Sequence, residues 1–240
     1  MVLDLYGVLV DPEATRRQYR PRLLAHLLAH HGGDSARWSS AYEAAHERYV
    51  RKVSFPSFWH DRPYAEAMRE AEAGFLEDLF KEAQRPAPTE DLLAYSQRLD
   101  TEIFSEIEAA YPESRSVLQE LRNLRLEVVV ATGAHLAQAR AAVRGSGLAA
   151  QVHGLLTSDH LGARKESPVF WQAAFSSMRR KPWDCVVVDD GPTKLEAAAR
   201  LGAHAVLVSR EGGHPYLPFK PVAVLSGLRT LPDVVRRIGG

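Results

Sequence analysis

The sequence of 240 residues predicts an α/β protein with a parallel sheet, into which an all-helical segment is inserted after the first strand. Two observations support this prediction. From residue 110 to the end, short apolar runs rich in β-branched residues alternate with helical patterns of about ten residues, which is typical of βαβ units. Residues 13–108 contain almost no such runs and carry Ala, Arg, Glu and Leu at helical spacing.

Each expected strand is a short apolar run that ends in polar residues or glycine, as buried strands do. These runs lie at 2–3, 126–131, 153–158, 185–189, 205–209 and 221–226. Helices are expected between them at 114–124, 134–145, 167–178 and 192–202. Strands that alternate with helices in this way are joined by right-handed crossovers into one parallel sheet.

Four helices are expected in the inserted segment, at 14–33, 34–52, 64–84 and 89–110. Stretches that contain glycine or proline separate them. Asp11 is expected to cap the first helix, because Pro12 suits the first helical position. Pro21 is expected to kink this helix or to restart it.

The composition favours neither a polyanionic partner nor a span across a membrane. Thirty basic residues balance thirty acidic ones, so no net charge favours a nucleic acid or an anionic membrane. No apolar run approaches the roughly 20 residues that a membrane-spanning helix needs. The single cysteine, Cys185, is expected to be a buried thiol of a strand. Since no signal segment precedes Asp4, we expect a cytoplasmic protein, either a monomer or a homodimer.

Several of the expected strands end in polar side chains. Because the carboxyl ends of parallel strands meet at one edge of a sheet, these side chains should lie close together. They belong to Asp4, Thr132, Asp189 and Asp190, and Lys165 is added from a loop before a helix. Three clustered carboxylates repel one another unless a cation joins them, and their oxygens suit a hard divalent ion such as Mg²⁺. The sequence therefore predicts a magnesium site at this edge.

Four segments that carry these residues resemble, in order, the motifs of the haloacid dehalogenase-like hydrolase superfamily. They are "LDLYGVLVD" (3–11), "VVVATG" (128–133), "KESPVF" (165–170) and "VVVDDGPTKLEAAARLGA" (186–203). The resemblance covers the whole chain. It implies a Rossmann-like α/β core formed by residues 1–12 and 109–240, and a helical cap formed by residues 13–108.

The resemblance also implies a hydrolase that acts on a small anionic substrate by covalent catalysis. Asp4 would attack the substrate and form an aspartyl intermediate, which water then hydrolyses. Thr132 and Lys165 would stabilise the negative charge that develops in the transition state. Gly133, next to Thr132, is expected to contact the substrate.

In the phosphatases that the sequence resembles, Mg²⁺ is held by the nucleophile, by an acidic residue of the fourth motif and by a backbone carbonyl. The corresponding groups here are the carboxylates of Asp4 and Asp190 and the carbonyl of Tyr6. Asp189 would be a direct or a water-mediated ligand. A Mg²⁺-dependent phosphatase is therefore the leading functional hypothesis.

Tyr6 departs from the phosphatase pattern, which has an aspartate there as general acid and base. A tyrosine, with a pKa of about 10, is a poor proton donor near neutral pH. The dehalogenases of the family carry tyrosine at this position, since a halide leaves without a proton, so a 2-haloacid dehalogenase is the alternative. Against it, dehalogenases replace the Asp189-Asp190 pair with small hydroxyl residues and carry an aspartate at the position of Lys194.

Lys194 leads to a third hypothesis. It lies one helical turn beyond Asp190, so its ammonium could pair with that carboxylate or with Asp189 in place of the metal. The protein would then be a degenerate member of the family that binds a ligand without turnover. The simpler alternative is a solvated lysine on an exposed helix face.

Substrate contacts are expected from "SFPSFWHDRPY" (54–64), in which His60 and Arg62 could close over a small anion. Alternatively, the aromatic residues of this stretch pack helices together and Arg62 is solvated. Arg48 or Arg51 could serve similarly. The loop 210–219 is expected to border the entrance of the site.

Overall fold

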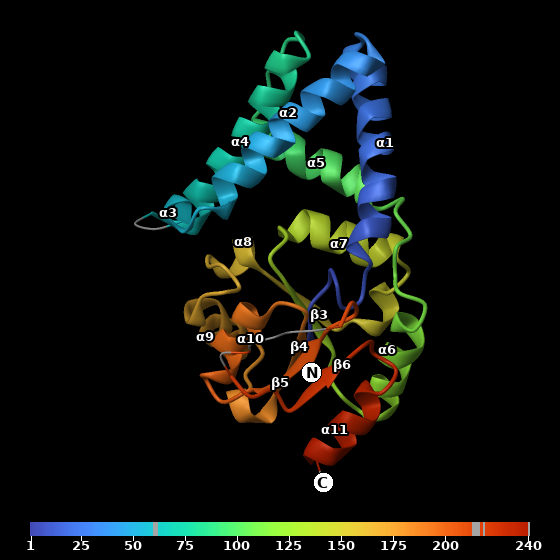
Figure 1. Ribbon diagram of the computed structural model, residues 1–240, viewed down its shortest axis with the longest axis vertical. Coiled ribbons are helices and arrows are strands. Elements are labelled where there is room, and N and C mark those ends of the chain that lie inside the picture. The colour runs from blue at the N-terminus through green and yellow to red at the C-terminus, as the bar shows by residue number, and fades with distance from the viewer. Residues whose placement is uncertain (60–61, 213–216, 218, 240) are drawn as a thin grey trace.

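The computed structural model describes residues 1–59, 62–212, 217 and 219–239. Within these residues, a layer of helices formed by α1–α5 stands on an α/β part that contains the sheet (Figure 1). We call α1–α5 the helical segment. His60, which was expected to contact the substrate, lies outside the described residues.

The described part of the chain forms one parallel six-stranded sheet with the order β3-β2-β1-β4-β5-β6. The strands are β1 (Val2–Leu3), β2 (Val129–Thr132), β3 (Gly154–Thr157), β4 (Val186–Asp189), β5 (His204–Val208) and β6 (Ala223–Leu225). In β1, Val2 lies opposite Val129 of β2 on one side and Val187 of β4 on the other. The predicted α/β class is confirmed, and its first strand lies in the middle of the sheet.

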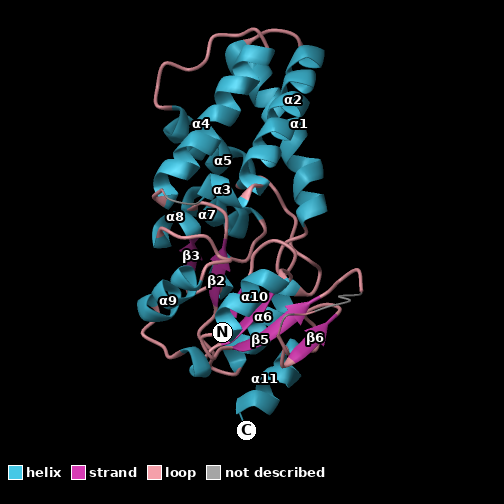
Figure 2. Ribbon diagram, turned by 60° about the vertical axis from the view of Figure 1, so that its left-hand side comes forward, coloured by secondary structure: helices cyan, strands magenta, loops and turns pink. Residues whose placement is uncertain are grey.

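Helices cover both faces of this sheet (Figure 2). Those of the α/β part are α6 (Ser114–Asn123), α7 (Leu136–Gly145), α8 (Ser158–Leu161), α9 (Pro168–Ser177), α10 (Pro192–Ala199) and α11 (Leu231–Gly239). Because successive residues of a strand point to opposite faces, Val130 and Val188 pack with α6, α7 and α11. Val129 and Val187 point to the other face and pack with α9 and α10.

The helical segment begins directly after the first strand and its loop. Its elements are α1 (Pro12–His31), α2 (Ser35–Ser54), α3 (Pro56–Trp59), α4 (Tyr64–Glu82) and α5 (Leu92–Phe104). The carboxylate of Asp11 caps α1, because its Oδ1 accepts the N–H of Glu13 at 2.8 Å. The helix continues through Pro21, so the expected restart there does not occur. The four long helices agree with the four expected from the sequence.

The two chain crossings between the helical segment and the α/β part lie side by side. Val10 on the outgoing chain pairs antiparallel with Ala110 on the returning chain. The N–H of Tyr111 donates to the carbonyl of Leu9 at 3.0 Å. The helical segment thus leaves and re-enters the α/β part at one place, as an insertion does.

Some boundaries differ from those expected. The strand expected at 126–131 begins at Val129, because its partner β1 offers only two residues to the ladder. The short helices α3 and α8 and the C-terminal α11 were not predicted. Cys185 is buried, as expected. Among the described helices, none combines the length and apolar character needed to cross a membrane.

Candidate active site

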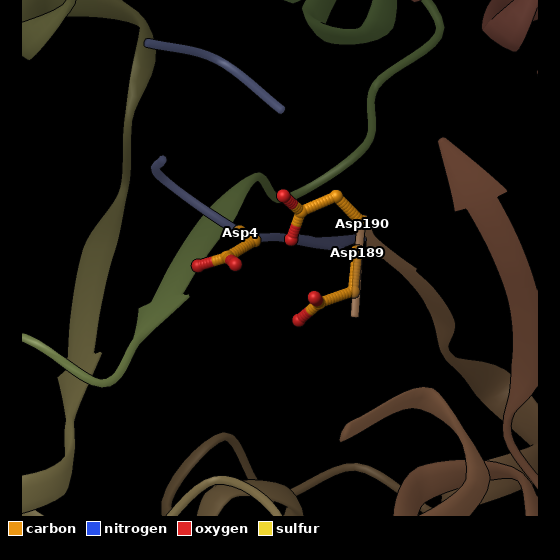
Figure 3. A group of neighbouring side chains, drawn as sticks. All are labelled: Asp4, Asp189 and Asp190. Atoms are coloured by element: carbon orange, nitrogen blue, oxygen red, sulfur yellow. The ribbon is translucent and has the colours of Figure 1, made fainter. Parts of the chain in front are cut away.

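Asp4 follows β1 directly and therefore lies at the centre of the sheet's carboxyl edge. Its backbone N–H donates to the carbonyl of Val188 in β4 at 2.8 Å. Asp189, the last residue of β4, comes next to it on the neighbouring strand. Figure 3 shows the side chains of Asp4, Asp189 and Asp190 gathered at this edge, where ligands of open α/β sheets bind.

These three carboxylates form a tight cluster. One oxygen from each lies within 4.8 Å of the others. Asp4 and Asp189 are buried, and Asp190 is partly exposed. The Asp190 carboxylate lies against Gly7, whose φ is +82°, and a Cβ there would meet Oδ2 of Asp190 at 2.0 Å. Only glycine therefore allows Asp190 to approach the loop that follows Asp4.

Lys165 joins two members of the cluster. Its Nζ lies 2.9 Å from Oδ1 of Asp4 and 2.6 Å from Oδ2 of Asp189, and it donates to the carbonyl of Ala131 at 2.6 Å. The side chain is 2% exposed. A buried ammonium with three oxygen partners is fixed in place, so Lys165 holds both carboxylates in one geometry.

The surroundings of Asp4 disfavour its charged form, although Lys165 lies beside it. Burial raises the pKa of its carboxyl group above the usual value, and the charge of Asp189 raises it further. The ammonium groups of Lys165 and Lys194 oppose this effect. The charged form of Asp4 thus depends on nearby cations, because a buried carboxylate is otherwise unfavourable.

Lys194 turns toward the cluster from α10. Its Nζ lies 3.6 Å from Asp4, 3.8 Å from Asp189 and 3.9 Å from Asp190. Burial lowers the pKa of its ammonium, but the three carboxylates outweigh this effect and raise the pKa above its usual value. The lysine is therefore charged and faces the carboxylates, in contrast to the solvated lysine considered as its simpler alternative.

Tyr6 lies beside the cluster but is not a proton donor at neutral pH. Burial, followed by the charge of Asp100, raises the pKa of its phenol well above the usual value. Its hydroxyl accepts a hydrogen bond from Nε2 of Gln138 at 3.3 Å. The phenol is therefore neutral, and it points toward α7 and the helical segment.

Thr132 and Gly133 lie at the end of β2, next to Lys165's backbone partner Ala131. The hydroxyl of Thr132 accepts the N–H of Ala134 at 3.3 Å and is buried. Within the described residues, no hydrogen bond joins Thr132 to Asp4. Gly133 is open on its side-chain face, since a Cβ there would meet nothing within 4 Å.

A cavity of about 230 Å³ opens above Gly133. Three cations line it from the α/β part, and the helical segment supplies largely aromatic walls. The cations are Arg164, Lys165 and Lys194, and the aromatic residues are Tyr49, Trp59 and Tyr64. Glu166 also lines the cavity and pairs with Arg164 at 3.3 Å, so the two lysines are the cations left for an anion. This combination suits a small anion that also carries an apolar group.

The arginines of the helical segment that were expected to contact the substrate have other partners. Arg62 donates to the carbonyl of Phe58 at 2.8 Å, forms an ion pair with Glu70, and does not line the cavity. Arg48 pairs with acidic residues of α4, and Arg51 pairs with Glu47. A substrate role for Arg62 stays a prediction that this arrangement does not favour.

Two arginines were not singled out from the sequence. The guanidinium of Arg164 lies over the ring of Trp59, 5.0 Å from its centroid, and so joins the α/β part to the helical segment. Its position directly before Lys165 was the available signal. Arg210 donates to the carbonyls of Gly7 at 3.0 Å and Val8 at 2.8 Å. It lies in the loop that was expected to border the site.

The family model described as haloacid dehalogenase-like hydrolase matches residues 1–202. The chain belongs to this family of hydrolases, and the resemblance of its motifs is thereby confirmed. A relative of the chain is Phosphatase MT3486 of Mycobacterium tuberculosis (strain CDC 1551 / Oshkosh), which is 32% identical over 139 residues. That match covers 58% of this chain and 61% of the relative, so it spans less than two thirds of the relative's length.

Solved structures share the whole fold. The 2-haloacid dehalogenase from Pseudomonas syringae pv. Tomato DC3000 is 20% identical, with a TM-score of 0.67 over 98% of this chain and 97% of that one. The HAD-hydrolase YfnB from Bacillus subtilis, described as bound to magnesium, is 11% identical, with a TM-score of 0.67 over 98% and 96% of the two chains. At these identities the likeness concerns the fold alone.

Proposed function

We propose that the protein is a Mg²⁺-dependent phosphoester hydrolase that acts through Asp4 on a small anionic substrate. The observation that carries this proposal is the cluster of Asp4, Asp189 and Asp190 beside the buried ammonium of Lys165. Membership of the hydrolase family and the match to a phosphatase support it.

The two oxygens of Asp4 differ in their surroundings. Oδ1 accepts the N–H of Leu5 at 2.8 Å and lies 2.9 Å from Nζ of Lys165. Oδ2 is therefore the oxygen that remains to attack phosphorus, and the ester oxygen leaves with the electrons of its bond to phosphorus. Water then attacks the aspartyl phosphate, releases phosphate and regenerates Asp4. Lys194, 3.6 Å from Oδ2, would stabilise the charge on the transferring group.

The residues at the site fit a magnesium ion. Mg²⁺ takes carboxylate oxygens, and Asp4, Asp189 and Asp190 present such oxygens to a common point. With Lys165 and Lys194 the site has one net negative charge, which would repel a phosphate dianion. When bound, Mg²⁺ would supply the positive charge that lets the dianion approach Asp4.

Tyr6 limits which phosphoesters can be good substrates. Its neutral phenol, held by Gln138, offers no acidic proton to the departing oxygen. General acid catalysis typically contributes about 10²–10⁴-fold to the rate. Turnover should therefore depend steeply on the acidity of the leaving alcohol.

A second candidate is a 2-haloacid dehalogenase. It is favoured by one observation, the neutral phenol at Tyr6, because a halide leaves without protonation. The retained pair Asp189 and Asp190 disfavours it. A catalytically degenerate protein, in which Lys194 takes the place of the metal, is a further alternative.

The test is a turnover screen of the purified protein against phosphoesters and 2-haloacids, with and without Mg²⁺. We expect phosphate release that requires Mg²⁺ and that is lost in Asp4→Asn, with the fold retained. Release of halide, independent of Mg²⁺, would establish the dehalogenase instead. Absence of turnover on every substrate, in a protein that shows no thermal response to Mg²⁺, would favour the degenerate alternative.

A further inference from the structure

A second cavity, of about 320 Å³, lies between the helical segment and the α/β part. Helices α1, α2, α4 and α5 supply most of its walls, and Tyr6 and Gln138 form its wall on the side of the α/β part. In Figure 1, α5 crosses the space between α1 and the α2–α4 pair, above α7. Tyr6, two positions after Asp4, therefore faces this cavity.

Aromatic rings enclose the cavity from two sides. Tyr19 of α1 packs on Phe104 of α5, with ring centroids 4.8 Å apart. On the other side, the ring centroid of Phe75 of α4 lies 6.2 Å from that of Tyr42 and 5.8 Å from that of Tyr49. Rings that surround a pocket in this way attract cations through their negative faces.

Glu72 places a partly buried carboxylate in this aromatic enclosure. It accepts hydrogen bonds from the hydroxyls of Tyr49 at 3.1 Å and Ser96 at 3.2 Å. Among the described residues, no lysine, arginine or histidine lies within 4 Å of it. Arg16, also at the cavity, is paired with Glu13 and largely exposed. Glu72 therefore faces the cavity with two hydroxyl partners and without a cationic one.

Asp100 supplies a second carboxylate, and both of its oxygens already have a side-chain partner. Its Oδ1 accepts the hydroxyl of Tyr19 at 2.9 Å, and its Oδ2 lies 2.9 Å from Nε2 of His135. The cavity thus has one carboxylate with a basic partner and one without. A neutral polyol could use the hydroxyls and rings, but it would leave Glu72 without a counter-charge.

We propose that this cavity binds an alkylammonium group, so that the preferred substrate is a phosphate monoester with an ammonium at its far end. The assignment of a phosphate monoester rests on the proposed function, whereas the ammonium specificity rests on the cavity alone.

The two cavities are arranged to receive the two ends of such a molecule. Tyr49 lines both of them. The phosphate end belongs near Lys165 and Lys194, which line the smaller cavity and flank Asp4. The ammonium end then reaches past Tyr49 to Glu72.

The test compares two phosphonates that are not hydrolysed and that differ only in charge. They are 3-(trimethylammonio)propylphosphonate and its carbon counterpart 4,4-dimethylpentylphosphonate. Binding to the intact protein with Mg²⁺ is measured by calorimetry, so the result does not depend on turnover or on the leaving group. We expect the ammonium compound to bind about 5- to 30-fold more tightly, the range of a desolvated cation–π and carboxylate contact.

Two variants on the same helix assign the preference to Glu72. Glu72→Gln keeps an acceptor for Tyr49 and removes the charge, so the ratio of the two dissociation constants should fall several-fold toward one. Glu77→Gln makes the same change at an exposed residue of α4 and should leave the ratio unchanged. Equal affinities in the parent protein, or an unchanged ratio in Glu72→Gln, would overturn the proposal.

Hydrolysis of 4-nitrophenyl phosphate by the same preparation tests the proposed function separately. Ammonium preference without any phosphoester turnover would refute the phosphatase and keep the ammonium site. Turnover without ammonium preference would keep the phosphatase and refute the ammonium site.

Discussion

Replacement of Lys194 by methionine should make the protein bind Mg²⁺ more tightly. Its ammonium lies 3.6 to 3.9 Å from one oxygen of each of Asp4, Asp189 and Asp190. A divalent ion at these carboxylates would therefore meet a positive charge nearby. Lys194→Met removes that charge and keeps an unbranched apolar side chain of similar length.

The size of the effect follows from the distances. Two unit charges about 4 Å apart interact by about 1 kcal/mol in water and more near a protein surface. Because Mg²⁺ carries two charges and Lys194 is 29% exposed, the water value gives a lower bound of about 2 kcal/mol, or roughly 30-fold in affinity. If the ammonium swings away instead, Mg²⁺ binding must break its attraction to the carboxylates, a loss of similar size.

The assay is the melting temperature as a function of Mg²⁺ concentration, since an ion that binds the folded state raises it by mass action. The midpoint for Lys194→Met should lie roughly 30-fold below that of the parent protein. Lys181→Met, at an exposed lysine, is the control and should not move it. If neither the parent protein nor Lys194→Met responds to Mg²⁺, the magnesium proposal is wrong. A response in Lys194→Met alone would show that Lys194 is the resident cation of the cluster.

Three further perturbations test other groups. Tyr6→Asp should raise phosphoester turnover by up to about 10²–10⁴-fold, most for alkyl phosphates and least for 4-nitrophenyl phosphate; faster halide release in the parent protein than in the variant would contradict this. Lys165→Met should lower the free energy of unfolding in urea by about 3–5 kcal/mol, because two buried carboxylates lose their partner, and added Mg²⁺ should recover part of the loss. Burial raises the pKa of Glu72 above its unfolded value of about 4.3, so the parent protein loses stability as the pH rises from there through the folded pKa. Glutamine does not titrate, so the melting temperature of Glu72→Gln relative to the parent should be higher at neutral pH than below pH 4. A difference in melting temperature that stays constant across this range would refute the assignment.

The positions of the site residues along the sheet were predictable because they follow from strand ends. Asp4 and Asp189 each come directly after a short apolar run, and parallel strands bring such positions to one edge. Lys165 was identified only because its motif resembles that of a known family. Its distance to Asp4 is set by the loop before α9, whose path no local pattern specifies.

The direction of single side chains was harder to predict. Lys194 has the sequence pattern of an exposed helical lysine, and only the packing of α10 turns it toward the carboxylates. Arg62 looked like an anion ligand because of its aromatic neighbours, yet its partners Phe58 and Glu70 lie in the same helical segment. For long side chains, many partners are sterically possible, so tertiary contacts decide among them.

The cavity around Glu72 had no signal in the sequence. Within α4, Glu72 is one of several glutamates with similar neighbours along the chain. Its environment arises because Tyr49 and Ser96 reach it from two other helices. Such a site depends on how four helices pack, which the amphipathic pattern of each helix does not specify.

The α/β part and the helical segment contribute differently to the site. Arg210 donates to the carbonyls of Gly7 and Val8 on the outgoing chain and forms an ion pair with Glu113 beside the returning chain. It thereby fixes the loop after Asp4 to the α/β part, to which all three clustered carboxylates also belong.

The walls of both cavities, in contrast, come partly from the helical segment, as Tyr49 illustrates. A shift of that segment would change the volume around a substrate without moving the carboxylates relative to one another. Changes in the helical segment should therefore alter which substrates bind, whereas changes near Arg210 should alter the chemistry of every substrate.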